Sequence, residues 1–148
     1  MNEGCCIDDE MQEVYEYIRD CDNILIASPI YFSELTGALL NIGSRLQTYF
    51  CARFFRKIIP IEKSKKGAVI IVGGGEGSSY KAYDTACCLL HHMNAIDILS
   101  AVVTHNTNNK PADKDETALE GVRDIIRFFN SYTIHGDDHN ILNTIRKL

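Results

Sequence analysis

The feature that most constrains this chain is a set of short, continuously apolar segments that alternate with polar loops and longer helical patterns. The clearest two are Asn-Ile-Leu-Ile-Ala at 23–27 and Gly-Ala-Val-Ile-Ile-Val at 67–72, and a third covers 96–104. Apolar runs of this kind are typical of strands that are buried on both faces, as in parallel sheets. Their alternation with helical segments predicts an α/β domain, in which a parallel sheet of about three strands lies between two layers of helices.

Helical periodicity connects these segments. Met11, Val14, Tyr15 and Ile18 repeat at the i, i+3, i+4, i+7 spacing of an amphipathic helix. We expect helices at about 8–19, 35–50, 80–93 and 114–132, and a terminal helix from about 138. The segment 50–65 gives the weakest pattern. With no internal repeat or linker, the sequence predicts one domain over residues 1–148.

Charge and composition narrow the possible partners. Fifteen Lys and Arg against 20 Asp and Glu give a net charge of −5 without a basic tract, so we expect no nucleic-acid partner. No apolar run approaches the roughly 20 residues that span a bilayer, and the first residues are polar and acidic. We therefore expect no membrane association and a cytoplasmic location. The six cysteines include two adjacent pairs and no C-x-x-C spacing, which predicts reduced thiols and no metal site.

Two unusual loops follow the first two predicted strands. The first contains Ser28, Pro29, Ile30, Tyr31 and Phe32, and the second contains Gly73, Gly74, Gly75, Glu76, Gly77 and Ser78. Alone, the glycine run is typical of a flexible turn, and the aromatic pair is typical of packing. However, ligands of open parallel sheets bind beyond the carboxyl ends of the strands, and glycines let the backbone approach a ligand closely. The shared position of the two loops favours a binding site.

The order of these segments resembles the family of NAD(P)H-dependent FMN reductases and iron–sulfur flavoproteins. The stretch Cys5-x-Ile7-x-Asp9-Glu10-Met11 resembles the family's C-x-I-x-D-D-M, and DNILIASPIYF at 22–32 resembles its A-D-x-I-I-x-x-S-P-V-Y-F. The glycine run looks like its second flavin loop. Thr107, Pro111 and Ala112 are similar to the T-D-K-x-P-A connection before its last helix.

The resemblance implies a flavodoxin-like three-layer sandwich that is truncated at its N-terminus. In such a protein, Pro29 to Phe32 would pack against the ribityl chain and one edge of the isoalloxazine ring of FMN. Backbone N–H groups of Gly73 to Ser78 would face the pyrimidine edge. NAD(P)H would pass a hydride to flavin N5, and because that step needs no side-chain acid or base, no catalytic residue is predicted.

The sequence departs from the family pattern in two respects. The 148 residues contain no segment like the family's G-S-P-R-x-x-x-x-S/T, which holds the FMN phosphate, and only Cys5 matches its compact cysteine motif. A four-iron cluster takes four thiolates, so we expect no iron–sulfur cluster. Without the family's first βαβ unit, the first strand has an unpaired edge. We expect a homo-oligomer to cover that edge, unless Met1 is not the natural start.

Two functions from different classes are consistent with this sequence. The first is an FMN-dependent NAD(P)H oxidoreductase, either a flavin reductase or an electron-transfer flavoprotein. The alternative is a flavin-free structural or interaction protein that kept the fold and lost the cofactor. The two retained loops favour the first function. The missing phosphate segment favours the second, because hydrogen bonds to a charged group contribute about 1.5–3 kcal/mol each.

Overall fold

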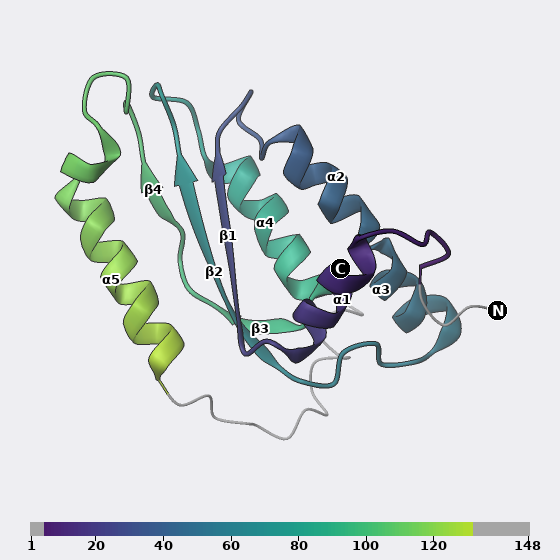
Figure 1. The fold of residues 1–148 in the computed structure, drawn as a ribbon. Coiled ribbons are helices and arrows are strands. Elements are labelled where there is room, and N and C mark those ends of the chain that lie inside the picture. Colours follow the sequence, from purple (N-terminus) through teal and green to yellow (C-terminus); the bar gives the residue numbers. More distant parts are fainter. Residues whose placement is uncertain (1–4, 132–148) are drawn as a thin grey trace.

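The computed structural model describes residues 5–131 as a parallel sheet with helices on both faces (Figure 1). The strands are β1 (Asn23–Pro29), β2 (Lys65–Val72), β3 (Ala95–Ile98) and β4 (Val102–Thr104). Strand β2 is central: β1 pairs with one of its edges, and β3 and then β4 pair along the other. The sheet therefore has three strand positions, which confirms the expected fold class. The terminal helix predicted from about residue 138 lies outside the described residues.

The helices follow the strands in the order that the sequence predicts. Their bounds are α1 (Met11–Asp20), α2 (Gly37–Arg45), α3 (Gln47–Cys51), α4 (Tyr80–His92) and α5 (Glu116–Asn130), with a π-helical turn η1 (Ala52–Arg56) and a 3₁₀ turn η2 (Ala112–Lys114). Side chains cap two of them: Thr36 accepts a hydrogen bond from the N–H of Leu39, and Asp115 accepts one from the N–H of Ala118. Such caps satisfy donors that the first helical turn leaves unpaired.

The two faces of the sheet carry separate hydrophobic clusters. On one face, Ile26, Val69 and Ile71 pack with α4 and with Met11 and Tyr49 from α1 and α3. On the other face, Ala68 and Val102 pack against Ala118 and Ile125 of α5. Figure 1 shows this arrangement, with α5 on one side of the strands and α2 and α4 on the other. Alternate residues of each buried strand thus serve different helical layers.

Three boundaries differ from those that the sequence predicts. The strand expected at 96–104 is two strands, because the chain leaves the ladder after Ile98, where the N–H of Leu99 donates to the Gly67 carbonyl at 3.0 Å. The helix expected at 35–50 is divided at Leu46, whose N–H donates to the Gly43 carbonyl in a tighter i→i−3 bond. The weakly patterned segment after residue 50 begins with η1, which ends at Lys57 in the left-handed conformation.

Strand β1 leaves one edge without a strand partner within residues 5–131. The Asp22 carbonyl accepts from the Lys66 N–H, and the Ile30 N–H donates to the Val72 carbonyl. In a parallel ladder, alternate residues bond to the same neighbour, so the odd-numbered residues of β1 direct their backbone groups away from β2. Leu25 is 47% exposed on the sheet face that α5 covers only in part. The structure therefore has the open first strand that the sequence predicts.

Two buried lysines secure the opposite end of the sheet. The Lys66 ammonium donates to the Phe128 carbonyl at 2.7 Å and to Ser131 Oγ at 2.8 Å, which ties the end of α5 to β2. The neighbouring Lys65 donates to the carbonyls of Arg19 and Cys21, both at 3.0 Å. Burial lowers the pKa of Lys65, since desolvation disfavours its charged form. These contacts fix the amino ends of the strands and leave the carboxyl ends to the loops.

Candidate functional site at the carboxyl end of the sheet

The two loops singled out in the sequence meet at the carboxyl ends of β1 and β2 (Figure 1). The Ile30 N–H donates to the Val72 carbonyl at 2.9 Å, which holds the start of the first loop beside the start of the second. A Cβ added to Gly73 would lie 3.4 Å from Ile30 Cδ1. Residues that are more than 40 positions apart in the sequence are therefore in contact, at the position where ligands bind to open parallel sheets.

The first loop forms a tight, hydrogen-bonded turn. The Tyr31 N–H donates to the Glu34 carbonyl, and the Glu34 N–H donates to the Tyr31 carbonyl, both at 3.0 Å. The two residues between them, Phe32 and Ser33, have positive φ angles of 52° and 62°. Left-handed backbone is costly for residues other than glycine. The turn nevertheless presents the Phe32 side chain fully to solvent, and Tyr31 is 61% exposed.

Two polar side chains hold this turn in place. The buried hydroxyl of Ser28 donates to the Pro29 carbonyl at 2.8 Å and accepts from the Thr36 N–H at 3.2 Å. The Glu34 carboxylate accepts from the Leu35 N–H at 2.9 Å and lies 3.3 Å from the Lys81 ammonium on α4. Burial raises the pKa of Glu34, but the bonds from Leu35, Thr85 and Lys81 outweigh that effect and lower it overall. Ser28 is therefore a structural member of the predicted site.

The glycine loop is clamped through its carbonyl groups. The carbonyl of Gly73 accepts from the Thr107 N–H at 3.1 Å, that of Gly74 from the Asn108 N–H at 3.3 Å, and that of Gly75 from the Asn106 N–H at 3.0 Å. The donors all lie in the loop after β4. These three bonds hold the first half of the glycine loop in place, and the Gly73 N–H is engaged as well, since it donates to the Thr104 carbonyl at 2.8 Å.

The far half of the glycine loop is open. Among the hydrogen bonds within residues 5–131, none uses the backbone N–H of Gly75, Glu76 or Gly77. A Cβ added to Gly75 or to Gly77 would meet no atom within 4 Å, and neither residue has a positive φ angle. By contrast, a Cβ on Gly74 would lie 3.1 Å from the Asn108 side chain. Packing within the chain therefore explains why position 74 is a glycine, but it does not explain why positions 75 and 77 are glycines.

The loop after β4 belongs to this site, although the sequence analysis did not assign it there. A Cβ on Gly73 would lie 3.1 Å from His105 Nδ1, so the exposed His105 borders the glycine loop. Asn106 has a positive φ of 59°, which shapes the turn that presents Thr107 and Asn108. The sequence feature that could have indicated this loop is the polar run directly after the third apolar segment.

A hydrogen bond from β4 anchors this third loop to α5. Thr104 Oγ1 donates to Asp115 Oδ2 at 2.8 Å, and the other carboxylate oxygen of Asp115 caps α5. The bond from Thr104, then that from the Ala118 N–H, lowers the pKa of Asp115. The carboxyl end of the sheet is thus bordered by three loops, each fixed by hydrogen bonds to a neighbouring segment.

Within residues 5–131, no group of three or more His, Cys, Asp or Glu side chains is placed to hold a metal ion. No helix in this part of the chain has the length and apolar character that crossing a bilayer requires. His91 and His92 end α4, where the pKa of His92 is lowered by burial, then by the charge of Arg53.

Comparison with known proteins identifies the family. Residues 1–112 match the model of the NADPH-dependent FMN reductase family. An iron–sulfur flavoprotein of Methanosarcina thermophila is 28% identical over 119 residues, which are 80% of this chain and 59% of that protein. An iron–sulfur flavoprotein of Methanocaldococcus jannaschii is 33% identical over 72 residues, which are 49% of this chain and 34% of that protein. The chain therefore spans between one third and three fifths of these relatives.

Solved structures of low sequence identity share the fold. An apo NADH:FMN oxidoreductase matches with a TM-score of 0.56 at 15% identity, covering 82% of this chain and 59% of that one. An NADPH-quinone reductase from P. pentosaceus matches with a TM-score of 0.55 at 14% identity, covering 85% and 77%. These likenesses support the flavodoxin-like fold. The family model, which matches most of the sequence, shows that this chain belongs to the NADPH-dependent FMN reductase family.

Proposed function

We propose that this chain acts as an FMN-dependent NAD(P)H oxidoreductase whose first two loops hold the isoalloxazine ring. The observation that carries the proposal is the open half of the glycine loop. Among the residues that the structure describes, none fills the space in front of Gly75 and Gly77 or bonds to their backbone N–H groups. A planar ligand with polar atoms on its edge fits such a surface, because the absent side chains let it approach the backbone. The exposed Phe32 offers an apolar contact next to it.

The residues of the site have distinct roles in this proposal. Backbone N–H groups of Gly75 to Gly77 donate to the pyrimidine edge of the ring, and Pro29 to Phe32 contact the ribityl chain and one ring edge. Ser28, Glu34 and the loop of residues 105–108 position these contacts. Bound FMN would accept a hydride from the nicotinamide at N5, and no side chain of the site needs to exchange a proton in that step.

The second candidate function is a flavin-free structural or interaction protein. It is favoured by one observation, which is that the 148 residues contain no motif like the family's phosphate-binding G-S-P-R.

The departure from the compact cysteine motif supports the further proposal that this chain carries no iron–sulfur cluster. We also propose a cytoplasmic location, since adjacent cysteine pairs suit a reducing compartment.

The association state follows from the open strand. We propose that a second copy of the chain covers the free edge of β1, since exposed strand edges with apolar side chains are prone to pair. The exposed Leu25 lies at that edge.

A spectrum and an activity assay separate the two functions. The purified protein is mixed with FMN and desalted, its visible spectrum is recorded, and oxidation of NADH and of NADPH is then followed with FMN present. A retained flavin band, or catalysed oxidation of either nucleotide above the rate with free FMN alone, supports the oxidoreductase. A colourless protein that gives no rate above that background supports the flavin-free alternative.

A further inference from the structure

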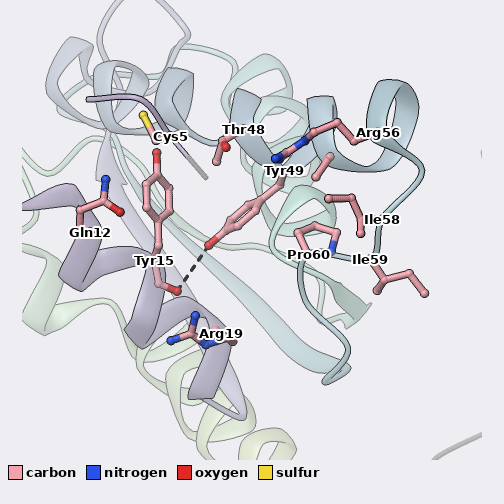
Figure 2. Close-up of a pocket in the computed structure, with 11 residues that line it drawn as sticks. Cys5, Gln12, Tyr15, Arg19, Thr48, Tyr49, Arg56, Ile58, Ile59 and Pro60 are labelled. Carbon is pink, nitrogen blue, oxygen red and sulfur yellow. Dashed lines mark hydrogen bonds between the residues drawn. The ribbon is translucent and has the colours of Figure 1, made fainter. Parts of the chain in front are cut away.

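A cavity of about 380 Å³ lies in the helical layer of the protein, and the residues of the two predicted flavin loops do not line it (Figure 2). Its lining comes from α1, α3 and η1, from the segment before α1 and from the segment after η1. The volume falls within the range of about 300–1,000 Å³ that is common for small-molecule sites. The cavity is therefore a candidate for a second binding site.

The walls of the cavity are largely apolar. The buried Tyr49 lies in the middle of the lining, with Tyr15 on one side of it and residues 58–60 on the other (Figure 2). The two tyrosine rings meet edge to face, with centroids 5.5 Å apart. Their hydroxyls are engaged, since that of Tyr15 donates to the Arg45 carbonyl at 2.9 Å and that of Tyr49 donates to the Tyr15 carbonyl at 3.5 Å. The rings therefore offer apolar surface to a ligand.

The backbone beside the cavity has two uncommon features. Helix η1 is π-helical, and the carbonyl of Ala52 at its start accepts from the N–H groups of both Lys57 and Ile58. Lys57 is left-handed, with a φ of 56°, which is costly for a residue other than glycine. Single π-helical turns are frequent at functional sites. After this turn, the lining residues Ile58 and Ile59 are 42% and 72% exposed, so the unusual backbone does not serve to bury them.

One hydroxyl in the lining is open to a ligand. Thr48 precedes Tyr49 on α3, its side chain is half-buried, and Figure 2 shows it beside the two tyrosine rings. Within residues 5–131, its hydroxyl has no hydrogen-bond partner. A threonine hydroxyl can both donate and accept. A ligand that packs against Tyr49 can therefore gain a hydrogen bond from Thr48.

The charged side chains of the lining are already engaged within the chain. Arg19 pairs with its neighbour Asp20 at 3.5 Å, and Arg56 takes part in an interaction of its own. The Cys5 thiol accepts a hydrogen bond from Arg45 at 3.3 Å. Burying a charge is costly when no opposite charge is provided for it. The cavity is therefore suited to a neutral ligand.

We propose that this cavity binds a small neutral aromatic compound with one hydroxyl group, the chemical class of the phenols. The ring of the ligand packs against Tyr49 and residues 58–60, and its hydroxyl bonds to Thr48. The cavity shares no residue with the loops proposed to hold the flavin ring. Its occupation is therefore independent of the proposed oxidoreductase activity.

The test is a titration of flavin-free protein with para-cresol, with toluene as the analogue that lacks the hydroxyl, and with benzoate as the charged analogue. Binding is followed by two-dimensional NMR of ¹⁵N-labelled protein. We expect saturable shifts at the amides of Thr48, Tyr49 and Ile59. Affinity for para-cresol should be about fivefold above that for toluene, as expected for one neutral hydrogen bond, and benzoate should bind more weakly than para-cresol.

Variants locate the binding. Thr48→Val keeps the shape of the side chain and removes the hydroxyl, so it should lower the affinity for para-cresol to about that for toluene and leave toluene unchanged. Thr117→Val makes the same change at an exposed position of α5 and is the matched control. Ile59→Ser removes part of the apolar wall at a side chain that is 72% exposed. It should weaken binding of both neutral probes by about threefold without loss of the fold.

Four outcomes would overturn the proposal. These are absence of saturable shifts with the neutral probes, equal affinity for para-cresol and toluene, a preference for para-cresol that survives in Thr48→Val, and benzoate binding as tight as that of para-cresol. Shifts spread over unrelated surfaces count as absence of binding at the cavity.

Discussion

At the scale of single residues, the backbone of Phe32 and Ser33 is the feature that folding alone does not account for. Both residues are left-handed, at a cost of roughly 1–2 kcal/mol each. The strain does not bury an apolar side chain, because Phe32 is fully exposed. Strained, exposed residues of this kind concentrate at functional sites, which supports a ligand contact for Phe32.

Glycine substitutions at Phe32 and Ser33 separate the effect of backbone strain on stability from the effect of the Phe32 side chain on flavin binding. Both Phe32→Gly and Ser33→Gly should raise the free energy of unfolding by up to about 1 kcal/mol, since the relieved strain of about 1–2 kcal/mol exceeds the entropic cost of glycine, about 0.5–1 kcal/mol. Only Phe32→Gly should weaken flavin binding, by about tenfold. Denaturant unfolding and flavin fluorescence titration measure the two effects. Equal flavin affinity in both variants would exclude Phe32 from the site.

The glycine loop offers a second comparison at this scale. Alanine at Gly75 or Gly77 meets no atom of residues 5–131 within 4 Å, so stability should change by no more than about 1 kcal/mol. Flavin binding should fall about tenfold, because the new methyl group enters the proposed ring position. Gly74→Ala is the matched control for a packing effect, since it crowds Asn108. If Gly75→Ala and Gly77→Ala bind flavin normally, the ring does not lie against this loop.

At the scale of elements, the sequence predicts β1, β2, the apolar segment that forms β3 and β4, and the major helices, because buried strands and amphipathic helices carry strong local patterns. The structure differs from the prediction where contacts between residues far apart in the sequence determine the conformation of the chain. The break between β3 and β4 falls between their separate pairings with β2, and the clamp on the glycine loop depends on residues 106–108. Similarly, a phenylalanine at position 32 does not predict a positive φ angle. The positions of the two loops could be predicted from the sequence. Which of their residues hold the loops in place, and which are left open to a ligand, could not be predicted.

Helix α5 and the third loop share the carboxylate of Asp115, which makes their stability pH-dependent. The folded-state pKa lies below the ordinary value of 3.8, chiefly because of the bond from Thr104. A lowered pKa stabilises the fold above the unfolded-state value, and this contribution is lost as the pH falls through the folded-state value. Asp115→Asn keeps a capping residue but should flatten the acid dependence of stability below about pH 4. Thermal unfolding at pH 3 and pH 7 measures the change, and an unaltered dependence would contradict this assignment.

At the scale of the whole molecule, the open edge of β1 governs association. If two copies pair through this edge, Leu25→Lys should convert a dimer to a monomer, because a charge at a strand edge opposes pairing. Ile42→Lys is the control, since Ile42 is also about half exposed but lies on α2. Sedimentation velocity at micromolar concentration distinguishes the species. A wild-type monomer, or a dimer that Leu25→Lys leaves intact, would contradict pairing at β1.

In the proposed function the described loops hold the flavin ring, and the 148 residues contain no motif like the family's phosphate-binding G-S-P-R. The most direct test is a fluorescence titration of the protein with riboflavin and with FMN in parallel. We expect the fluorescence of both flavins to be quenched and their dissociation constants to lie within about threefold of each other, because the shared ring makes the contacts. Absence of binding by both flavins, or a preference for FMN of more than about a hundredfold, would contradict the claim that these loops hold the ring.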